Sequence, residues 1–235
     1  MSPHSQGNSR IILFDIDGTL LKAGGIVRKA MGEALEKVFG TRGGIEDTSF
    51  TGATDLGVVH KLMEKEGFAT AEIADRFGNL TEVYGPILRN KLSTWNDYHF
   101  CPGVPDILDS LKDNGSMLGL VTGNCRVGAQ VKLDRGGLGD YFQFGAYGDE
   151  TRDRAEIARL AHQRGVEKAK KDIPRDSVIL VGDSPNDIKA AHDYGIRILA
   201  VFSGWTPKEE LETLKPTWLY PDMSNIKQIT SLLLS

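Results

Sequence analysis

The sequence predicts an α/β protein in which a parallel sheet is interrupted by a helical insertion. The first observation behind this fold class is a run of four apolar residues, Ile11–Phe14, that is typical of a strand buried on both faces. The second is the stretch 22–98, where apolar residues recur only at helical spacing. The third is the alternation of apolar runs and helical patterns after residue 99, which is typical of parallel strands joined by right-handed crossovers.

The bulk composition is that of an ordinary globular protein. The chain has 235 residues, of which 40% are hydrophobic and 26% are charged, and its net charge of −4 gives no electrostatic reason to expect nucleic acid or a membrane surface as a partner. The two cysteines, Cys101 and Cys125, lack the spacing of a zinc site. No apolar run is long enough to span a membrane, and the polar start lacks the apolar core of a secretion signal, so we expect a cytoplasmic protein.

The helical insertion follows the first strand after a short link at 21–25. Helices are expected at 26–39, 55–66 and 70–91, with a loop rich in glycine and threonine at 41–54. Gly40 is a plausible end of the first of these helices. The predicted domains are therefore a helical domain at 22–98 and an α/β core made of 1–21 and 99–235.

The core resumes near residue 99 and alternates strands with helices until the C-terminus. We expect strands at 118–121, 143–146, 178–181, 196–202 and 218–219. Helices are expected between them at 102–113, 126–135, 155–165 and 185–191, with a closing helix at 226–234.

Polar side chains follow three of these strands at the point where each strand ends. They are Asp15 and Asp17 after the first strand, Thr122-Gly123-Asn124 after the second, and Gly182-Asp183 up to Asp187 after a later one. Each group alone has a structural explanation, as a turn, a helix cap or a first-turn acid. Parallel strands bring all three groups to one edge, where ligands bind in open α/β folds. Carboxylates this close together repel unless a cation lies between them or one takes up a proton; a divalent cation is the simplest answer, because Mg²⁺ suits hard oxygen ligands.

These motifs resemble those of a known superfamily. Asp15-Ile16-Asp17-Gly18-Thr19, Val121-Thr122-Gly123-Asn124 and Gly182-Asp183-Ser184-Pro185-Asn186-Asp187 look like motifs I, II and IV of the haloacid dehalogenase-like hydrolases. The resemblance implies a Rossmann-like, three-layer α/β/α core with an inserted α-helical cap of subclass I. Softer similarities, such as Thr51-Gly52-Ala53-Thr54-Asp55, point to the phosphoglycolate phosphatase and β-phosphoglucomutase-like group.

The residue types fit phosphate chemistry independently. A carboxylate can attack phosphorus and form an aspartyl-phosphate, so Asp15 is the candidate nucleophile. Asp17, two residues later, is placed to protonate the leaving oxygen and then to activate water. Mg²⁺ would neutralise charge in the transition state. The resemblance implies that its ligands are the Asp15 carboxylate, the Asp17 backbone carbonyl and the Asp183 carboxylate, with Asp187 in a supporting role.

Substrate-binding groups are expected from two loops. Thr122 offers a hydroxyl, and the backbone amides of Gly123 and Asn124 offer donors to phosphate oxygens at a helix start. From the insertion, Thr51 and Gly52 are our candidates for the loop that reaches the site.

One departure from the family pattern concerns the cation beside the nucleophile. Members of the group usually carry a lysine in the loop after the next strand, whereas this loop reads Gly148-Asp149-Glu150-Thr151-Arg152-Asp153-Arg154. We expect Arg154 to take the place of that lysine, with Arg152 as second choice, because an arginine also supplies a fixed positive charge. In the alternative interpretation, both arginines pair with the acids of this loop.

The favoured function is a Mg²⁺-dependent phosphatase that hydrolyses a small, phosphoglycolate-like phosphate monoester. A β-phosphoglucomutase-like mutase would share the motifs. A dehalogenase fits less well, because the resemblance implies that dehalogenases need no metal and lack the acid equivalent to Asp17. In a non-enzymatic binding protein, so many clustered acids would only be destabilising. The expected partner is a small phosphorylated metabolite, with no nucleic acid or membrane, and the sequence does not indicate an oligomeric state.

Overall fold

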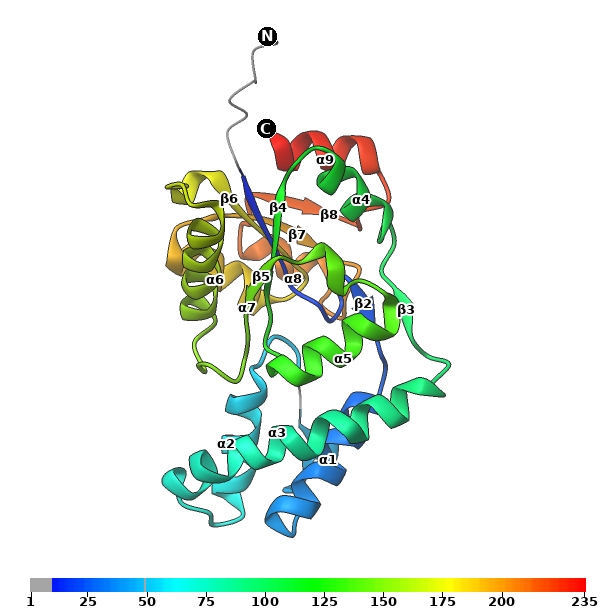
Figure 1. The fold of residues 1–235 in the computed structure, drawn as a ribbon, viewed down its shortest axis with the longest axis vertical. Helices are drawn as coiled ribbons and strands as arrows, with labels where there is room; N and C mark the ends of the chain where they lie inside the picture. Colours follow the sequence, from blue (N-terminus) through cyan, green and yellow to red (C-terminus); the bar gives the residue numbers. More distant parts are fainter. Residues whose placement is uncertain (1–9, 49) are drawn as a thin grey trace.

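A six-stranded parallel sheet forms the centre of the protein in the computed structural model, which describes residues 10–48 and 50–235 (Figure 1). The strand order is β5-β4-β1-β6-β7-β8, and every neighbouring pair is parallel. The strands are β1 (Ile11–Phe14), β4 (Met117–Val121), β5 (Phe144–Ala146), β6 (Val178–Gly182), β7 (Arg197–Val201) and β8 (Trp218–Tyr220). The predicted α/β class is confirmed.

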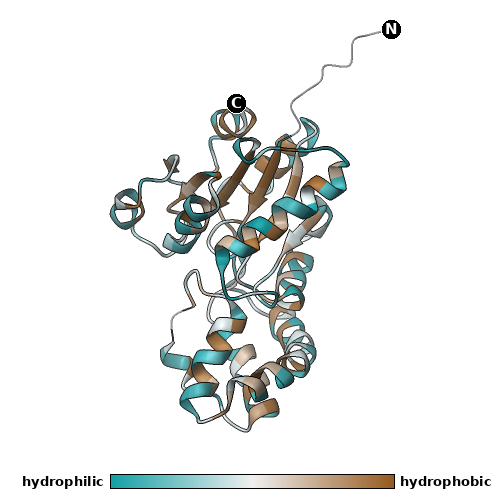
Figure 2. Cartoon of the chain, turned by 90° about the vertical axis from the view of Figure 1, so that its left-hand side faces the viewer, coloured by the Kyte–Doolittle hydropathy of each residue, from teal (hydrophilic) through white to brown (hydrophobic). Residues whose placement is uncertain are grey.

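Helices cover both faces of the sheet, because alternate side chains of each strand point to opposite faces. Ile12 and Phe14 of β1 face the side covered by α4 (Asp106–Asp113), α5 (Arg126–Gly136) and α9 (Ile226–Leu234). Ile11 and Leu13 face the side covered by α6 (Arg154–Ala169), α7 (Pro185–Tyr194) and α8 (Lys208–Thr213). Figure 2 shows the apolar strands between helices that present hydrophilic residues outward. The core is therefore the predicted three-layer α/β/α arrangement.

The insertion between β1 and β4 lies beyond the carboxyl ends of the strands (Figure 1). It contains α1 (Ile26–Phe39), α2 (Asp55–Lys65) and α3 (Thr70–Ser93), whose apolar residues pack together. Short strands β2 (Leu21–Lys22) and β3 (His99–Phe100) pair in antiparallel fashion where the chain leaves the core and returns to it. The expected link at 21–25 therefore begins with a strand. The predicted division into domains at 22–98 stays a prediction.

Further local features differ from the expectations. Helix α4 begins at Asp106 rather than at Pro102, because Gly103 has a φ of +91°, which is not helical, and its backbone lies against Met223. Helix α8 and three short 3-10 helices were not expected. These 3-10 helices are η1 (Ile45–Asp47), η2 (Gly139–Tyr141) and η3 (Arg175–Ser177). None of the helices in residues 10–48 and 50–235 combines the length and apolar character that a membrane span requires.

Candidate active site

The candidate site lies at the carboxyl edge of the three central strands. Asp15 follows β1, Thr122 follows β4, and Asp183 follows β6, and β1 is paired with both neighbours. A cavity of about 350 Å³ opens there between the sheet edge and the insertion. The edge contributes Asp15, Asp17 and Asp183 to its wall, and the insertion contributes Arg28 and Phe50. The convergence expected from the parallel strands is present.

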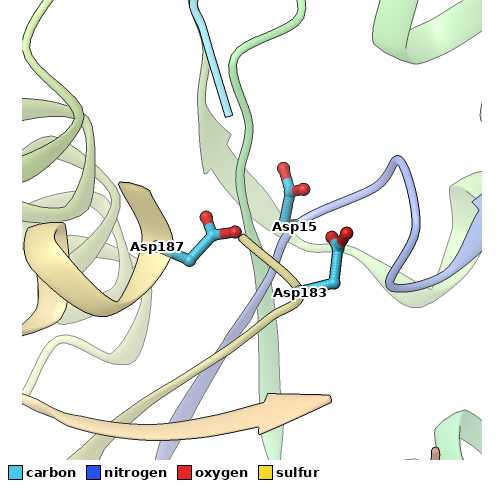
Figure 3. Close-up of side chains that lie close together, drawn as sticks. All are labelled: Asp15, Asp183 and Asp187. Atoms are coloured by element: carbon cyan, nitrogen blue, oxygen red, sulfur yellow. The ribbon is translucent and has the colours of Figure 1, made fainter. Parts of the chain in front are cut away.

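Three buried carboxylates form the centre of this edge. Asp15, Asp183 and Asp187 are 6%, 1% and 0% exposed. Each has an oxygen within 4.8 Å of the others, and in Figure 3 the three side chains gather from the loops after β1 and β6 and from α7. Burial, followed by the charge of Asp187, raises the pKa of Asp15 to about 7. Burial and the charge of Asp15 likewise raise the pKa of Asp183. Such a set fits a divalent cation, which would relieve the repulsion.

The hydrogen bonds indicate which of these acids can hold the cation. One Asp187 oxygen accepts from the backbone N–H of Ser184 at 3.0 Å and from its hydroxyl at 2.6 Å, which completes a capping box at the start of α7. The other oxygen accepts from Arg154. Asp183 accepts from the Thr19 hydroxyl at 3.0 Å, and no other donor to it is present among the described residues. Asp15 and Asp183 are therefore better placed as direct ligands, and Asp187 supports them.

Arg154 supplies positive charge beside the candidate nucleophile. Its Nη2 lies 3.1 Å from Asp15 Oδ1, and the same atom donates to Asp187. Although burial alone would lower it, the charges of Asp187 and Asp15 raise the pKa of Arg154, which stays ionised. Arg152, by contrast, is exposed. The structure thus brings the first-choice arginine to Asp15, and the alternative in which Arg154 pairs with acids of its own loop does not describe its contacts.

Lys132 of α5 is a component of the site that the sequence interpretation missed. It is 1% exposed, and its Nζ lies 2.8 and 2.7 Å from the two carboxylate oxygens of Asp17 and 2.6 Å from Asn124 Oδ1. The Asn124 amide also donates to Asp17 at 2.7 Å. A signal was available, because position 132 shares a helix face with the small residues Gly128 and Ala129. That face is buried, so the lysine had to be paired inside the protein.

The loop after β4 is where the core meets the insertion. The Thr122 hydroxyl oxygen accepts from both the backbone N–H and the side-chain amide of Asn124, at 3.2 and 2.7 Å. Thr122 is fully buried and is not among the described residues that line the cavity, whereas Gly123 and Asn124 are. The Gly123 carbonyl accepts from the N–H of Asp55 in α2 at 2.7 Å. The predicted contact of Thr122 with a phosphate stays a prediction.

The loop of the insertion that was expected to reach the site does line the cavity. Thr51 and Gly52 both contribute to the wall, and the Gly52 carbonyl accepts from the Asn186 amide at 2.8 Å. Gly52 has a φ of +65°, and a Cβ there would lie 2.8 Å from Ser184 Oγ, so only glycine fits this approach. Nearby, the Asp55 carboxylate accepts from the Cys125 N–H at 2.8 Å. Thus α2 and the loop before it are docked on the core beside the acids.

Comparisons with known proteins agree with this geometry. The profile of the family described as haloacid dehalogenase-like hydrolase matches residues 12–201, which run from β1 through the insertion to β7. The chain belongs to the haloacid dehalogenase-like hydrolase family. The predicted family and the prediction of a hydrolase are confirmed.

Relatives in the haloacid dehalogenase-like family carry phosphatase names. A phosphoglycolate phosphatase from Agrobacterium fabrum is 29% identical over 209 residues, which cover 87% of this chain and 86% of the relative. Pyrophosphatase PpaX from Bacillus anthracis is 24% identical over 225 residues, covering 94% and 95%. A solved structure described as a predicted phosphoglycolate phosphatase from Haemophilus somnus aligns with a TM-score of 0.66 at 23% identity, covering 96% of this chain and 99% of the other. This last likeness supports the fold.

Proposed function

We propose that the protein is a Mg²⁺-dependent phosphatase that hydrolyses a small phosphate monoester through an aspartyl-phosphate. The observation that carries the proposal is Asp15 at the cavity wall, 3.1 Å from the Arg154 guanidinium and beside Asp183. A nucleophilic carboxylate must meet a phosphate of like charge, and this arrangement supplies positive charge where the two approach.

Each step of the proposed reaction is assigned to particular residues of the chain. Asp15 would attack phosphorus, so that the bond to the leaving oxygen breaks and an acyl phosphate forms on its carboxylate. Arg154 holds Asp15 and would share its remaining donors with phosphate oxygens. Asp17, protonated when the substrate binds, would give that proton to the leaving oxygen. It would then take a proton from the water whose oxygen attacks the phosphorus of the acyl phosphate, which releases phosphate and the Asp15 carboxylate. Lys132 and Asn124 fix the Asp17 carboxylate.

A metal ion is the remaining requirement. Asp15 and Asp183 would hold Mg²⁺ together with the Asp17 backbone carbonyl, and Asp187 would support them by orienting Arg154. Bound Mg²⁺ supplies neutralisation of the negative charge that the nucleophile and the phosphate bring together. The raised pKa of Asp15, about 7, is consistent with a group that needs a cation to be fully ionised near neutrality.

The size of the cavity and the names of the relatives favour a small metabolite. About 350 Å³ is near the lower end of the range for small-molecule pockets. The Agrobacterium fabrum relative is named a phosphoglycolate phosphatase, and a phosphoglycolate-like ester is our candidate substrate class. The expected location is the cytoplasm.

A phosphate-release screen tests the proposal. Wild type, Asp15→Asn and Asp172→Asn would be assayed on small phosphate esters with excess Mg²⁺ and with a chelator. Asp172 is an exposed acid and serves as the matched control. We expect Asp15→Asn and chelation to abolish release and Asp172→Asn to behave as wild type. Normal turnover by Asp15→Asn would contradict the mechanism, full activity in chelator would indicate a metal-free hydrolase, and isomerisation of a sugar phosphate without phosphate release would indicate a mutase.

A further inference from the structure

Three cationic side chains line the cavity in the part of the chain that the structure describes, and one of them differs from the others. Arg154 is paired with Asp15 and Asp187, and Lys132 is paired with Asp17. Arg28, in the first turn of α1, has no carboxylate within ion-pair distance among residues 10–48 and 50–235. The two core cations are thus matched to acids of the site, and the cation from the insertion is not.

The Arg28 guanidinium is nevertheless held in place. Its Nη2 donates to the Thr48 backbone carbonyl at 2.9 Å, and its central carbon lies 5.4 Å from the centre of the Phe50 ring, which also lines the cavity. Its Nε is enclosed and has no hydrogen-bond partner among the described residues. Nε is too enclosed for a ligand in the cavity to reach, so a bound anion would instead meet the rest of the guanidinium, whose positive charge no carboxylate of the described residues balances.

The surroundings of Arg28 suit an anion. The neighbouring wall of the insertion consists of small or apolar residues, namely Ala23, Gly24, Gly25, Val27 and Phe50. The one acid that α2 adds to the wall, Asp55, is engaged by the Cys125 N–H. An oxyanion on this side of the cavity would therefore meet Arg28 without facing a free carboxylate of the insertion. The planar fork of arginine matches the oxygens of a carboxylate or phosphate.

We propose that Arg28 binds a second oxyanion of the substrate, at the end opposite the phosphate that Asp15 attacks. This inference rests on the proposed phosphatase function. It favours small phosphate compounds that carry a carboxylate or another phosphate, including the anhydride pyrophosphate, over monoesters without a second charge. Arg28 is then a specificity-determining residue, because a neutral ester would leave its positive charge without a counter-charge. Two anionic ends, held by different parts of the chain, also fix the substrate's orientation in the cavity.

The test compares a charged substrate with a neutral analogue of similar size. The values of kcat/KM for 2-phosphoglycolate, pyrophosphate and ethyl phosphate would be measured for wild type, Arg28→Met, Arg28→Lys and Lys29→Met. Lys29 is the matched control, because it is the next cation of α1, is exposed, and lies 5.8 Å from the Trp95 ring rather than at the cavity. We expect Arg28→Met to lower the preference for an anionic substrate over ethyl phosphate by about 10- to 100-fold, mainly through KM.

The control variants and substrates separate the outcomes. Arg28→Lys should keep part of the preference, and Lys29→Met should keep all of it. If Arg28→Met lowers kcat/KM only for 2-phosphoglycolate, the site binds a carboxylate; if it lowers kcat/KM only for pyrophosphate, the site binds a phosphate. Either result supports the proposal. Equal losses on all three compounds, or no change in preference, would overturn it, because Arg28 would then be only a packing residue.

Binding measurements keep this inference separate from the proposed function. Calorimetry on Asp15→Asn and on the double variant Asp15→Asn/Arg28→Met needs no turnover. With the same ligands, the added Arg28→Met substitution should weaken the binding of 2-phosphoglycolate or pyrophosphate far more than the binding of ethyl phosphate. If wild type releases no phosphate from any ester but this difference in binding is seen, the phosphatase proposal fails and the oxyanion site stands. If turnover is normal but the affinities change equally, the oxyanion site fails alone.

Discussion

Removing Arg154 perturbs both the stability and the chemistry of the site. Its side chain is 7% exposed, and the Asp15 and Asp187 side chains that it contacts are 9% and 0% exposed. Breaking a buried ion pair by deleting one partner costs about 3–5 kcal/mol when the remaining charge is trapped. Protonation of Asp15 would reduce this loss of stability, because its pKa is already about 7. We therefore expect Arg154→Ala to fold with a free energy of unfolding lower by at most this amount.

Activity should fall more sharply than stability. Loss of one charge-stabilising contact in a transition state costs about 3 kcal/mol, or roughly a hundredfold in kcat. The Arg154 charge also holds the pKa of Asp15 down, so its removal should move that pKa above about 7. Without Mg²⁺ the nucleophile would then be protonated at neutral pH, so Mg²⁺ should bind this variant more weakly, and part of the lost activity should return as the pH or the Mg²⁺ concentration rises.

The assay is phosphate release between pH 5.5 and 9, at Mg²⁺ concentrations from limiting to saturating, for three variants. Arg154→Ala should lose most activity, Arg154→Lys should keep part because one ammonium can reach one carboxylate, and the exposed Arg152→Ala should be milder. If Arg152→Ala loses more activity than Arg154→Ala, Arg152 rather than Arg154 supplies the charge beside Asp15. If neither alanine variant is impaired, the charge comes from elsewhere, and Lys132 is the nearest alternative in the core.

Four further predictions follow from the geometry of the site. Because the pKa of Asp15 is raised from 3.8 to about 7, metal-free protein should lose stability as the pH rises through that window. Mg²⁺ affinity should rise about tenfold per pH unit below pH 7, and calorimetry showing a flat affinity would contradict this. Lys132→Met should lower kcat by about 10- to 100-fold with less effect on KM, because Asp17 loses the ammonium that orients it; wild-type kinetics would refute that role. Gly52→Ala should raise KM and lower the midpoint of thermal unfolding more than Gly44→Ala does. Both glycines have a φ near +65°, but only position 52 lacks space for a Cβ. Equal effects of the two substitutions would exclude the contact of this loop with the core.

The parts of the fold that could be predicted are those in which the pattern is local. Four-residue apolar runs such as Ile11–Phe14 identify buried strands without knowledge of their partners. The two-residue strands β2 and β3 could not be found in this way, because each exists only by pairing with the other across the whole insertion. The late start of α4 depends on the contact of Gly103 with Met223, which is equally remote in sequence.

In the candidate site, too, some residues could be predicted from local sequence and others depend on contacts that are remote in sequence. The convergence of Asp15, Asp183 and Asp187 could be predicted because each follows a strand or opens the helix after it, and parallel strands end at one edge. Lys132 was missed because a lysine in a helix is normally solvated, and its burial depends on how α5 packs on the loops after β1 and β4. Arg28 was missed because nothing local distinguishes it from its exposed neighbour Lys29.

The distribution of charge explains why a site of this kind needs both parts of the chain. In the core, Arg154 and Lys132 are matched to the acids that would handle the reacting phosphate, so these cations cannot also select the rest of a substrate without giving up those acids. The insertion adds Arg28, whose positive charge is paired with no acid among the described residues. A substrate with two anionic ends would satisfy both sets at once, whereas a neutral ester would satisfy only the core. If Arg28 selects substrates as proposed, the chemistry would stay constant in the core while the first turn of α1 would decide which phosphate compounds react there.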